Sequence, residues 1–236
     1  MLKYKRILLK LSGESLQEKG KETIDLSILD QYVEDIITAY QKGVQIAIVV
    51  GGGNIFRGWQ GSSKGMDRVQ ADYMGMLATV INSMAIQGVL KSKNIKAKIF
   101  SGLDIHPITT KMSKFNAIDA LNDGNIIIIS GGTGNPYFTT DSAAALRGIE
   151  IEADIILKGT RVDGVYTADP EKDPKATKYK HLTYSEALQK ELKIMDLTAF
   201  TLCQENNMPI CVFDMNTKGN LLKVINGEDI GTIVSV

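Results

Sequence analysis

The sequence contains few of the residues that build disulfide scaffolds and metal sites. Its 236 residues include two cysteines and two histidines. Cys203 and Cys211 match no metal-binding spacing, so we expect reduced thiols in the core. His106 and His181 have no partner at ligand spacing, and we interpret both as structural or surface residues. A disulfide scaffold and a cysteine-based metal centre are therefore not expected.

Excess charge of either sign is also lacking. Lys plus Arg and Asp plus Glu both total 27, which gives a formal net charge of zero. Nothing in this balance argues for a nucleic-acid or anionic-membrane surface, so we expect any anion to be bound by local charge. No apolar run has the length of a membrane span, and residues 1–6 lead into a strand rather than a signal peptide. We expect a cytoplasmic enzyme with no nucleic-acid or membrane partner.

Two common nucleotide-binding fingerprints are missing. The chain has no Gly-x-x-x-x-Gly-Lys-Ser/Thr sequence, which excludes an ordinary P-loop kinase. The Gly-x-Gly stretches at 51–53 and 132–134 have Phe56 and Tyr137 where the dinucleotide fingerprint requires its third glycine. What remains is a set of separate glycine-containing strand ends.

Strand and helix patterns alternate along the whole chain. The expected strands, most of them apolar runs typical of strands buried on both faces, are 5–11, 44–50, 95–100, 125–130, 153–158, 210–213 and 232–236. The expected helices are 25–41, 69–92, 113–121, one from 142, 184–190, 198–206 and a short one around Leu221. This order predicts one α/β domain with three αβα layers and a mainly parallel central sheet.

The stretch 131–141, between an apolar strand and a small-residue helix, is the most informative part of the chain. Its glycines let the backbone approach a ligand closely, and Asn135-Pro136 enforces a turn. Residues 139–141 supply hydroxyl and carboxylate oxygens at a helix start. Because ligands bind at the carboxyl ends of strands in an open parallel sheet, this loop suits a phosphate or a nucleotide. The alternative is an ordinary strand-to-helix loop with Asp141 as its cap.

Two lysines stand at the ends of buried strands. Lys10 precedes Ser12-Gly13, and Lys158 repeats that position before Gly159. Two lysines directed into one crevice would neutralise a polyphosphate. Taken alone, the segment around Lys10 is better explained by a solvated lysine at a strand end.

A second glycine-rich loop follows the strand 44–50. Three consecutive glycines at 51–53 expose successive backbone N–H groups, and Arg57 adds a planar cation that can bind phosphate through two hydrogen bonds. A purely structural loop rarely needs three glycines, which favours binding. The Gly- and Ser-rich stretch 59–65 is expected to be a mobile flap.

The helix 69–92 has more apolar positions than one core-facing stripe requires, so we expect a neighbouring subunit to cover part of it. Asp72, near its start, is either a first-turn carboxylate favoured by the helix dipole or a ligand contact.

Five stretches in this order resemble the amino-acid-kinase superfamily and, within it, the bacterial uridylate kinases, over essentially the whole chain. They are 10–14, 51–58, 72–79, 132–141 and 162–170. The resemblance implies transfer of the γ-phosphoryl group of ATP to UMP, giving UDP and ADP. Mg²⁺ would arrive with ATP rather than in a protein cluster. Asp169 and Asp196 are its candidate protein ligands.

The resemblance also assigns residues to each substrate. The ATP-binding residues would be Lys10, Leu11, Ser12, Gly13, Gly53, Arg57, Thr160, Tyr166 and Asp169. The UMP-binding residues would be Gly52, Asp72, Thr133, Gly134, Asn135, Pro136, Tyr137, Phe138, Thr139 and Thr140. Residues 1–150 would form the UMP-binding and oligomerisation half of the domain, and residues 151–236 the ATP-binding half.

The chemistry of phosphoryl transfer agrees with that assignment. It requires in-line placement and stabilisation of charge on the equatorial oxygens, with little covalent work by the protein. Lys10 and Lys158 are the candidate catalytic cations, and Asp141 is the carboxylate expected to keep them from repelling each other.

One segment departs from the family pattern. Many bacterial uridylate kinases carry a Gly-Phe-Gly-like segment linked to GTP activation, where this chain has Glu18–Thr23. The resemblance further implies a homohexamer inhibited by UTP. Two other functions remain open: a kinase for a small carboxylate or carbamate, and a non-catalytic nucleotide or oxyanion storage protein on the same fold.

Overall fold

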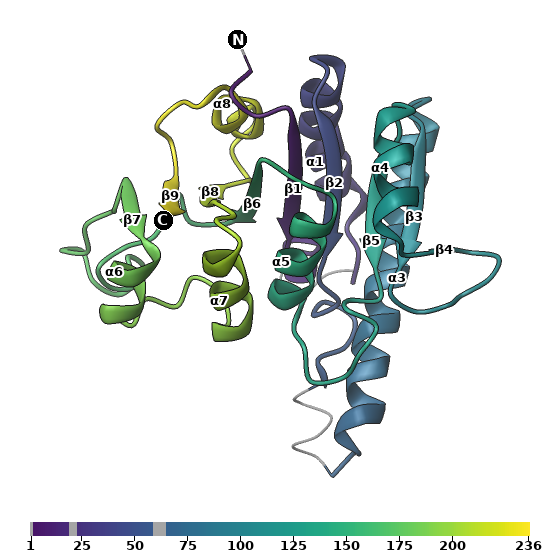
Figure 1. The fold of residues 1–236 in the computed structure, drawn as a ribbon, viewed down its shortest axis with the longest axis horizontal. Coiled ribbons are helices and arrows are strands. Elements are labelled where there is room, and N and C mark those ends of the chain that lie inside the picture. The colour runs from purple at the N-terminus through teal and green to yellow at the C-terminus, as the bar shows by residue number, and fades with distance from the viewer. Residues whose placement is uncertain (1, 19–22, 59–64) are drawn as a thin grey trace.

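The computed structural model describes residues 2–18, 23–58 and 65–236. Within them, nine strands form one sheet in the order β4-β3-β5-β2-β1-β6-β8-β9-β7. Every neighbouring pair is parallel except β8 and β9. Helices cover both faces of the sheet (Figure 1). The predicted α/β class, with three layers and a mainly parallel sheet, is confirmed.

The strands are β1 (Arg6–Leu11), β2 (Gln45–Val50), β3 (Ala97–Ser101), β4 (Thr110–Lys111), β5 (Ile126–Ser130), β6 (Ile155–Thr160), β7 (His181–Thr183), β8 (Ile210–Asp214) and β9 (Thr232–Ser235). The helices are the 3₁₀ helix η1 (Gly13–Leu16), α1 (Leu26–Gln41), α3 (Arg68–Ser92), α4 (Lys114–Asn122), α5 (Thr140–Glu150), α6 (Tyr184–Gln189), α7 (Leu197–Glu205) and α8 (Asn220–Asn226).

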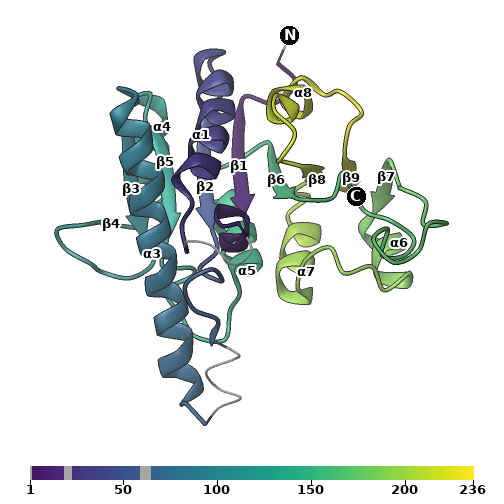
Figure 2. The same ribbon diagram turned by 180° about the vertical axis from the view of Figure 1, so that it is seen from behind.

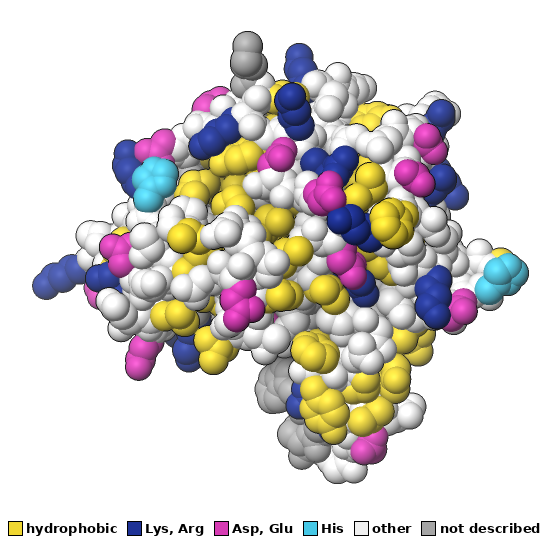
Figure 3. All heavy atoms as spheres, in the orientation of Figure 1, with side chains coloured by type: hydrophobic (Ala, Val, Ile, Leu, Met, Phe, Trp, Pro, Cys, Tyr) yellow, Lys and Arg dark blue, Asp and Glu magenta, His cyan; other side chains and the backbone are white. Residues whose placement is uncertain are grey.

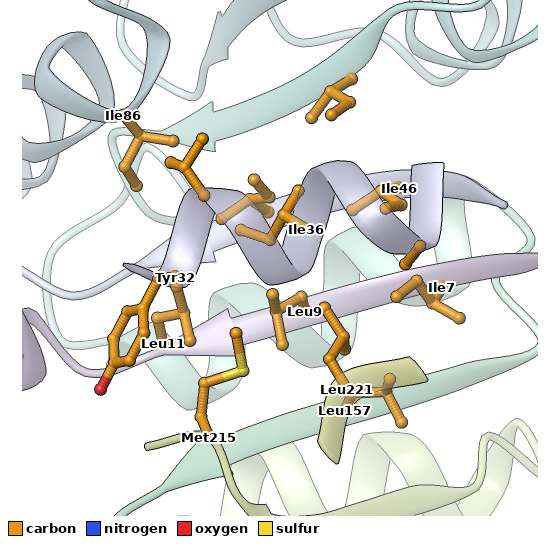
Figure 4. Packing of buried hydrophobic residues seen from close by; sticks show 14 of the residues in the cluster. Ile7, Leu9, Leu11, Tyr32, Ile36, Ile46, Ile86, Leu157, Met215 and Leu221 are labelled. Atoms are coloured by element: carbon orange, nitrogen blue, oxygen red, sulfur yellow. The ribbon is translucent and has the colours of Figure 1, made fainter. Parts of the chain in front are cut away.

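Successive residues of β1 contribute to different cores, because side chains alternate across a strand. Ile7, Leu9 and Leu11 pack beneath α1, α3 and α8, the face shown in Figure 2 and, in detail, in Figure 4. Leu8 lies in the opposite core, formed with α4, α5, α6 and α7. Each fully buried aliphatic side chain contributes about 1.5–3 kcal/mol to folding, so the central strands stabilise both layers.

The helix predicted at 25–41 is confirmed with a well-defined start and stop. The side chain of Asp25 accepts hydrogen bonds from the backbone N–H groups of Ser27 and Ile28, which satisfies donors of the first turn. Lys42 closes the helix, and Gly43 follows with a φ of +88°. Replacing Asp25 by alanine would remove the cap, at a cost of about 1 kcal/mol.

The long helix α3 is apolar on both its inner and its outer surface. Ala71, Met76 and Ile86 face the protein, whereas Tyr73, Leu77, Ile81 and Met84 are exposed. By length and composition alone, α3 could cross a membrane, but its contacts with β3, β5 and α1 are those of a core helix. Apolar side chains gather on the lower projection of the molecule, where Figure 1 places the start of α3 (Figure 3). A covering subunit remains a prediction.

Two short strands were not expected. β4 and β7 have two and three residues and lie at the edges of the sheet, so neither contains a full alternating pattern. The predicted strand 153–158 begins later and continues to Thr160. Lys158 therefore lies inside β6 rather than at its end.

The cysteines and histidines occupy the expected environments. Cys203 and Cys211 are free and buried, and burial raises the pKa of each thiol to about 12. His106 and His181 lie on the surface. The predicted flap includes residues 59–64, and the segment linked to GTP includes residues 19–22, both outside the described residues.

Candidate active site

Two lysines lie side by side at the centre of the sheet. Because β1 and β6 are parallel neighbours in a fixed register, Lys10 is paired directly with Lys158. Asp141, at the start of α5, lies between their ammonium groups. One carboxylate oxygen is 2.8 Å from Lys10 Nζ and the other is 2.9 Å from Lys158 Nζ. We call these three residues the Lys-Asp-Lys cluster.

Burial and charge act against each other in this cluster. Burial alone would raise the pKa of the Asp141 carboxyl, but the two ammonium groups outweigh it and hold that pKa below its ordinary value. Burial lowers the pKa of the Lys158 ammonium, and Asp141 offsets this only in part. Lys158 Nζ also donates a hydrogen bond to the carbonyl of Ile194. The cluster thus holds a net positive charge in a partly dehydrated position.

The start of α5 is fixed by neighbouring polar groups. Thr139 caps the helix by accepting hydrogen bonds from the N–H groups of Asp141 and Ser142. The cap suggested for Asp141 is therefore wrong: Thr139 has that role, and the carboxylate is free to bind the lysines. Thr139 and Ser142 also donate hydrogen bonds to Asp196, which itself caps α7. These contacts set the direction in which Asp141 points.

On one side of the cluster is an open cavity of about 310 Å³. Both glycine-rich loops contribute to it, together with one side of α3. Its lining residues are Gly52, Gly53, Phe56, Arg57, Gly58, Arg68, Asp72, Gly75, Met76, Thr79, Gly132, Thr133, Asn135, Phe138, Thr139 and Thr140. We call this the first cavity.

Seven of the ten predicted UMP-binding residues line the first cavity. They are Gly52, Asp72, Thr133, Asn135, Phe138, Thr139 and Thr140. Gly134, Pro136 and Tyr137 belong to the same loop but are not among the lining residues. Gly134 packs against the Gly102 backbone: a Cβ added to Gly134 would lie 2.6 Å from the carbonyl oxygen of Gly102.

Asp72 lies within the first cavity and is already hydrogen-bonded. One of its carboxylate oxygens accepts from Arg68 Nε and from the backbone N–H of Tyr137, each at 2.8 Å. The Arg68 guanidinium also lies 5.4 Å from the centre of the Tyr137 ring. Asp72 therefore links α3 to the loop 131–139.

A second cavity, of about 630 Å³, lies on the other side of the lysines. Lys10 and Lys158 contribute to its wall, and none of its lining residues belongs to the first cavity. The lining residues are Lys10, Ser12, Glu14, Ser15, Gln17, Ile28, Gln31, Tyr32, Lys158, Gly159, Thr160, Arg161 and Asn216.

The predicted ATP-binding residues are divided between several places. Lys10, Ser12 and Thr160 line the second cavity. Gly53 and Arg57 line the first cavity, although Arg57 forms an ion pair with Glu14 of the second.

The remaining predicted ATP-binding residues lie away from both cavity walls. Leu11 is in the core, and Gly13 is packed against the carbonyl of Gly51. Tyr166 and Asp169 lie in the loop after β6, where Tyr166 donates a hydrogen bond to Asp163.

The two candidate Mg²⁺ ligands, Asp169 and Asp196, lie outside the walls of both cavities. Among the described residues, no group of three or more His, Cys, Asp or Glu side chains could hold a metal. Asp196 faces the start of α5, and Asp169 is exposed and paired with Lys172 at 3.2 Å. Each could supply at most one carboxylate to a Mg²⁺ ion bound to a nucleotide.

The sequence interpretation missed several residues of the two cavities. Arg68, Met76 and Thr79 line the first cavity, and their helical spacing from Asp72 could have shown that they share its face. Tyr32 and Asn216 line the second, with a 2.6 Å hydrogen bond between residues 184 positions apart. No local pattern could have shown that contact.

Known proteins are similar to this chain in sequence and in fold. The amino acid kinase family matches residues 5–214. The chain is 59% identical over 234 residues to the uridylate kinase of Bacteroides thetaiotaomicron, with 99% of each chain covered. It is similar to the solved UMP kinase of Ureaplasma parvum, with a TM-score of 0.94, 39% identity and 100% of each chain covered. For the UMP kinase of Bacillus anthracis the TM-score is 0.95 at 35% identity, covering 98% of this chain and 96% of that one. The chain therefore belongs to the amino acid kinase family, as a member of its uridylate kinase group.

Proposed function

We propose that this protein transfers the γ-phosphoryl group of ATP to UMP, producing UDP and ADP. The observation that carries the proposal is the Lys-Asp-Lys cluster between two cavities, with Lys10 and Lys158 in the wall of one and Thr139 and Thr140, next to Asp141, in the wall of the other. The similarity to proteins named uridylate kinase and UMP kinase supports the choice of acceptor.

The first cavity takes UMP in this proposal. Asp72 accepts hydrogen bonds from the ribose hydroxyls, and the backbone N–H groups near Gly52 and Gly53 face the phosphate. Arg57 lines the first cavity, and its ion-pair partner Glu14 lines the second. Its guanidinium group is the proposed cation for the phosphates between the two cavities.

The second cavity takes ATP. The ATP phosphates lie over Ser12 at the end of β1, within reach of Lys10 and Lys158, and Thr160 lies toward the nucleoside. Mg²⁺ bound to these phosphates would neutralise charge on their oxygens, with Asp196 or Asp169 as its single protein ligand.

The reaction then requires little proton transfer. An oxygen of the UMP phosphate, which is already anionic, attacks the γ-phosphorus as the bond to the ADP oxygen breaks. Lys10 and Lys158 stabilise the charge on the equatorial oxygens of the transferring group. Asp141 holds both ammonium groups in place, so their positions need no reorganisation during the reaction.

We also propose that the protein acts in the cytoplasm, in the synthesis of UTP and CTP. UTP, a product of that synthesis, is the proposed allosteric inhibitor. The exposed apolar residues of α3 are the proposed contact between subunits of a homo-oligomer, a hexamer by resemblance. Residues 1–150 and 151–236 are the proposed UMP-binding and ATP-binding halves.

The proposal is tested by measuring ADP release with ATP and Mg²⁺ in the presence of UMP, CMP, dUMP, AMP, acetylglutamate, aspartate or no acceptor. We expect turnover largely confined to UMP. Activity with an amino acid would overturn the assigned acceptor site. Binding of ATP without turnover on any acceptor would indicate a storage protein instead.

A further inference from the structure

We propose that α3 positions both glycine-rich loops of the active site through two buried side chains, Thr79 and Asn82. This inference rests on the proposed function, because it concerns how the two loops that line the first cavity are placed. No role was assigned to either residue from the sequence, although Thr79 ends the stretch 72–79 that carries the family resemblance. Asn82 lines neither cavity.

Asn82 holds the loop after β2. Its side chain is fully buried in the middle of α3. One amide nitrogen donates to the carbonyl of Gly51 at 2.7 Å and to Asn54 Oδ1 at 2.8 Å. Asn54 Nδ2 donates back to Asn82 Oδ1 at 3.1 Å and to the carbonyl of Thr23 at 2.8 Å. The two amides therefore form a reciprocal pair that fixes the loop from both ends of its glycine run.

Thr79, one turn earlier on α3, holds the loop after β5. Its hydroxyl oxygen accepts a 2.8 Å hydrogen bond from the backbone N–H of Gly131, and the hydroxyl donates to the carbonyl of Met76. Because β2 and β5 are parallel neighbours, Gly51 and Gly131 leave the sheet side by side. One buried stripe of α3 thus contacts both strand ends.

The backbone packing supports the same role. A Cβ added to Gly52 would lie 2.7 Å from the carbonyl oxygen of Gly75 and 2.8 Å from Cβ of Ala78. The loop therefore rests directly on the small-residue side of α3, and any shift of this helix would move the N–H groups that face the acceptor phosphate. A displacement of about 1 Å in such a group can lower a rate by about 10²-fold.

The experiment measures kcat and KM for UMP and for ATP, together with thermal unfolding, in Thr79→Val, Thr79→Ser, Asn82→Ala and Asn82→Asp. Valine has the shape of threonine without the oxygen, whereas serine keeps the oxygen. Ser83→Ala is the matched control, because Ser83 is buried on α3 and its hydroxyl donates to the Thr79 carbonyl of the same helix.

We expect Thr79→Val and both Asn82 variants to reduce kcat/KM for UMP by about tenfold or more, in line with one or two misplaced phosphate contacts. Thr79→Ser should recover the wild-type value to within about threefold, and Ser83→Ala should stay close to it, since neither removes a contact with a loop. If Thr79→Val is as active as Ser83→Ala, the inference is overturned, whether or not the Asn82 variants fold.

Failure of the proposed function gives a different result. Wild-type protein with no turnover on UMP would reject that function, and the variants would then be compared by the equilibrium affinity for UMP and ATP. Equal affinities in wild type, Thr79→Val and Asn82→Ala would reject the positioning role, while a loss confined to the variants that break a loop contact would support it.

Discussion

The two sides of the Lys-Asp-Lys cluster are built in different ways. On the side of the first cavity, the loops at 51–54 and 131–139 are held by buried contacts from α3 and by the Asp72 carboxylate. On the other side, the loop 161–180 is mostly exposed, and its ion pairs include Arg161–Glu171, Lys172–Asp169, Lys178–Asp163 and Lys180–Asp229. Exposed pairs contribute only about 0–1 kcal/mol each. The proposed acceptor side is thus held by buried contacts before binding, whereas the loop on the proposed donor side has fewer such contacts and can adjust to a ligand.

The largest effect is expected at the cluster that both sides share. Lys10→Ala removes a cation from the transferring phosphoryl group and should lower kcat by about 10²-fold to 10³-fold, while changing the KM for UMP far less. Steady-state kinetics measures both constants. Lys98→Ala, at the exposed position of β3, is the control and should behave as wild type. If Lys10→Ala raised KM and left kcat unchanged, Lys10 would have no role in the catalytic step.

A second test changes the charge between the lysines. Burial already lowers the pKa of Lys158, and Asp141 raises it. In Asp141→Asn that pKa should fall further, so Lys158 loses its proton at a lower pH and the alkaline limb of the kcat profile moves to lower pH. The measurement is kcat against pH in both proteins. An unchanged alkaline limb would show that Lys158 does not act as the protonated stabiliser.

The acceptor side predicts an effect on binding rather than on chemistry. Hydrogen bonds to a charged group contribute about 1.5–3 kcal/mol, so Asp72→Asn should raise the KM for UMP by about tenfold to a hundredfold with little change in the KM for ATP. Initial rates at varied UMP and at varied ATP separate the two constants. An equal rise in the KM for UMP and in the KM for ATP would mean that Asp72 supports the site as a whole.

The smallest effect is expected in the exposed loop. Lys178→Ala breaks the 2.8 Å pair with Asp163, and it should lower the free energy of unfolding by less than about 1 kcal/mol. The difference from wild type should shrink further at high salt, because salt screens exposed charges. Denaturant unfolding at low and high ionic strength provides the measurement. A decrease of several kcal/mol in the free energy of unfolding would contradict the view that this loop is held only by weak exposed contacts.

The sequence predicted those parts of the site that depend on local patterns. Buried strands have recognisable composition, so the glycines and lysines at their carboxyl ends could be assigned to one edge of the sheet. The register that pairs Lys10 with Lys158 is a consequence of neighbouring strands and was not visible in either segment alone.

The contacts that hold the loops could not be predicted in the same way. The amide pair of Asn54 and Asn82 joins residues 28 positions apart, and an asparagine inside an apolar helix carries no signal of its partner. The alternative in which Asp141 caps α5 could not be rejected from the sequence, because Thr139 and Asp141 are both good capping residues; the hydrogen bonds of Thr139 and the ion pairs of Asp141 decide between them.

The register of β1 places a strict limit on insertions and deletions. This strand is paired in register with β2 on one side and with β6 on the other. Removing one residue between Arg6 and Leu9 would rotate every later side chain to the opposite face. Leu11 would then take the direction of Lys10, and the ammonium group would point into a hydrophobic layer. Over these six residues the chain therefore tolerates exchange of one apolar side chain for another far better than any change in length.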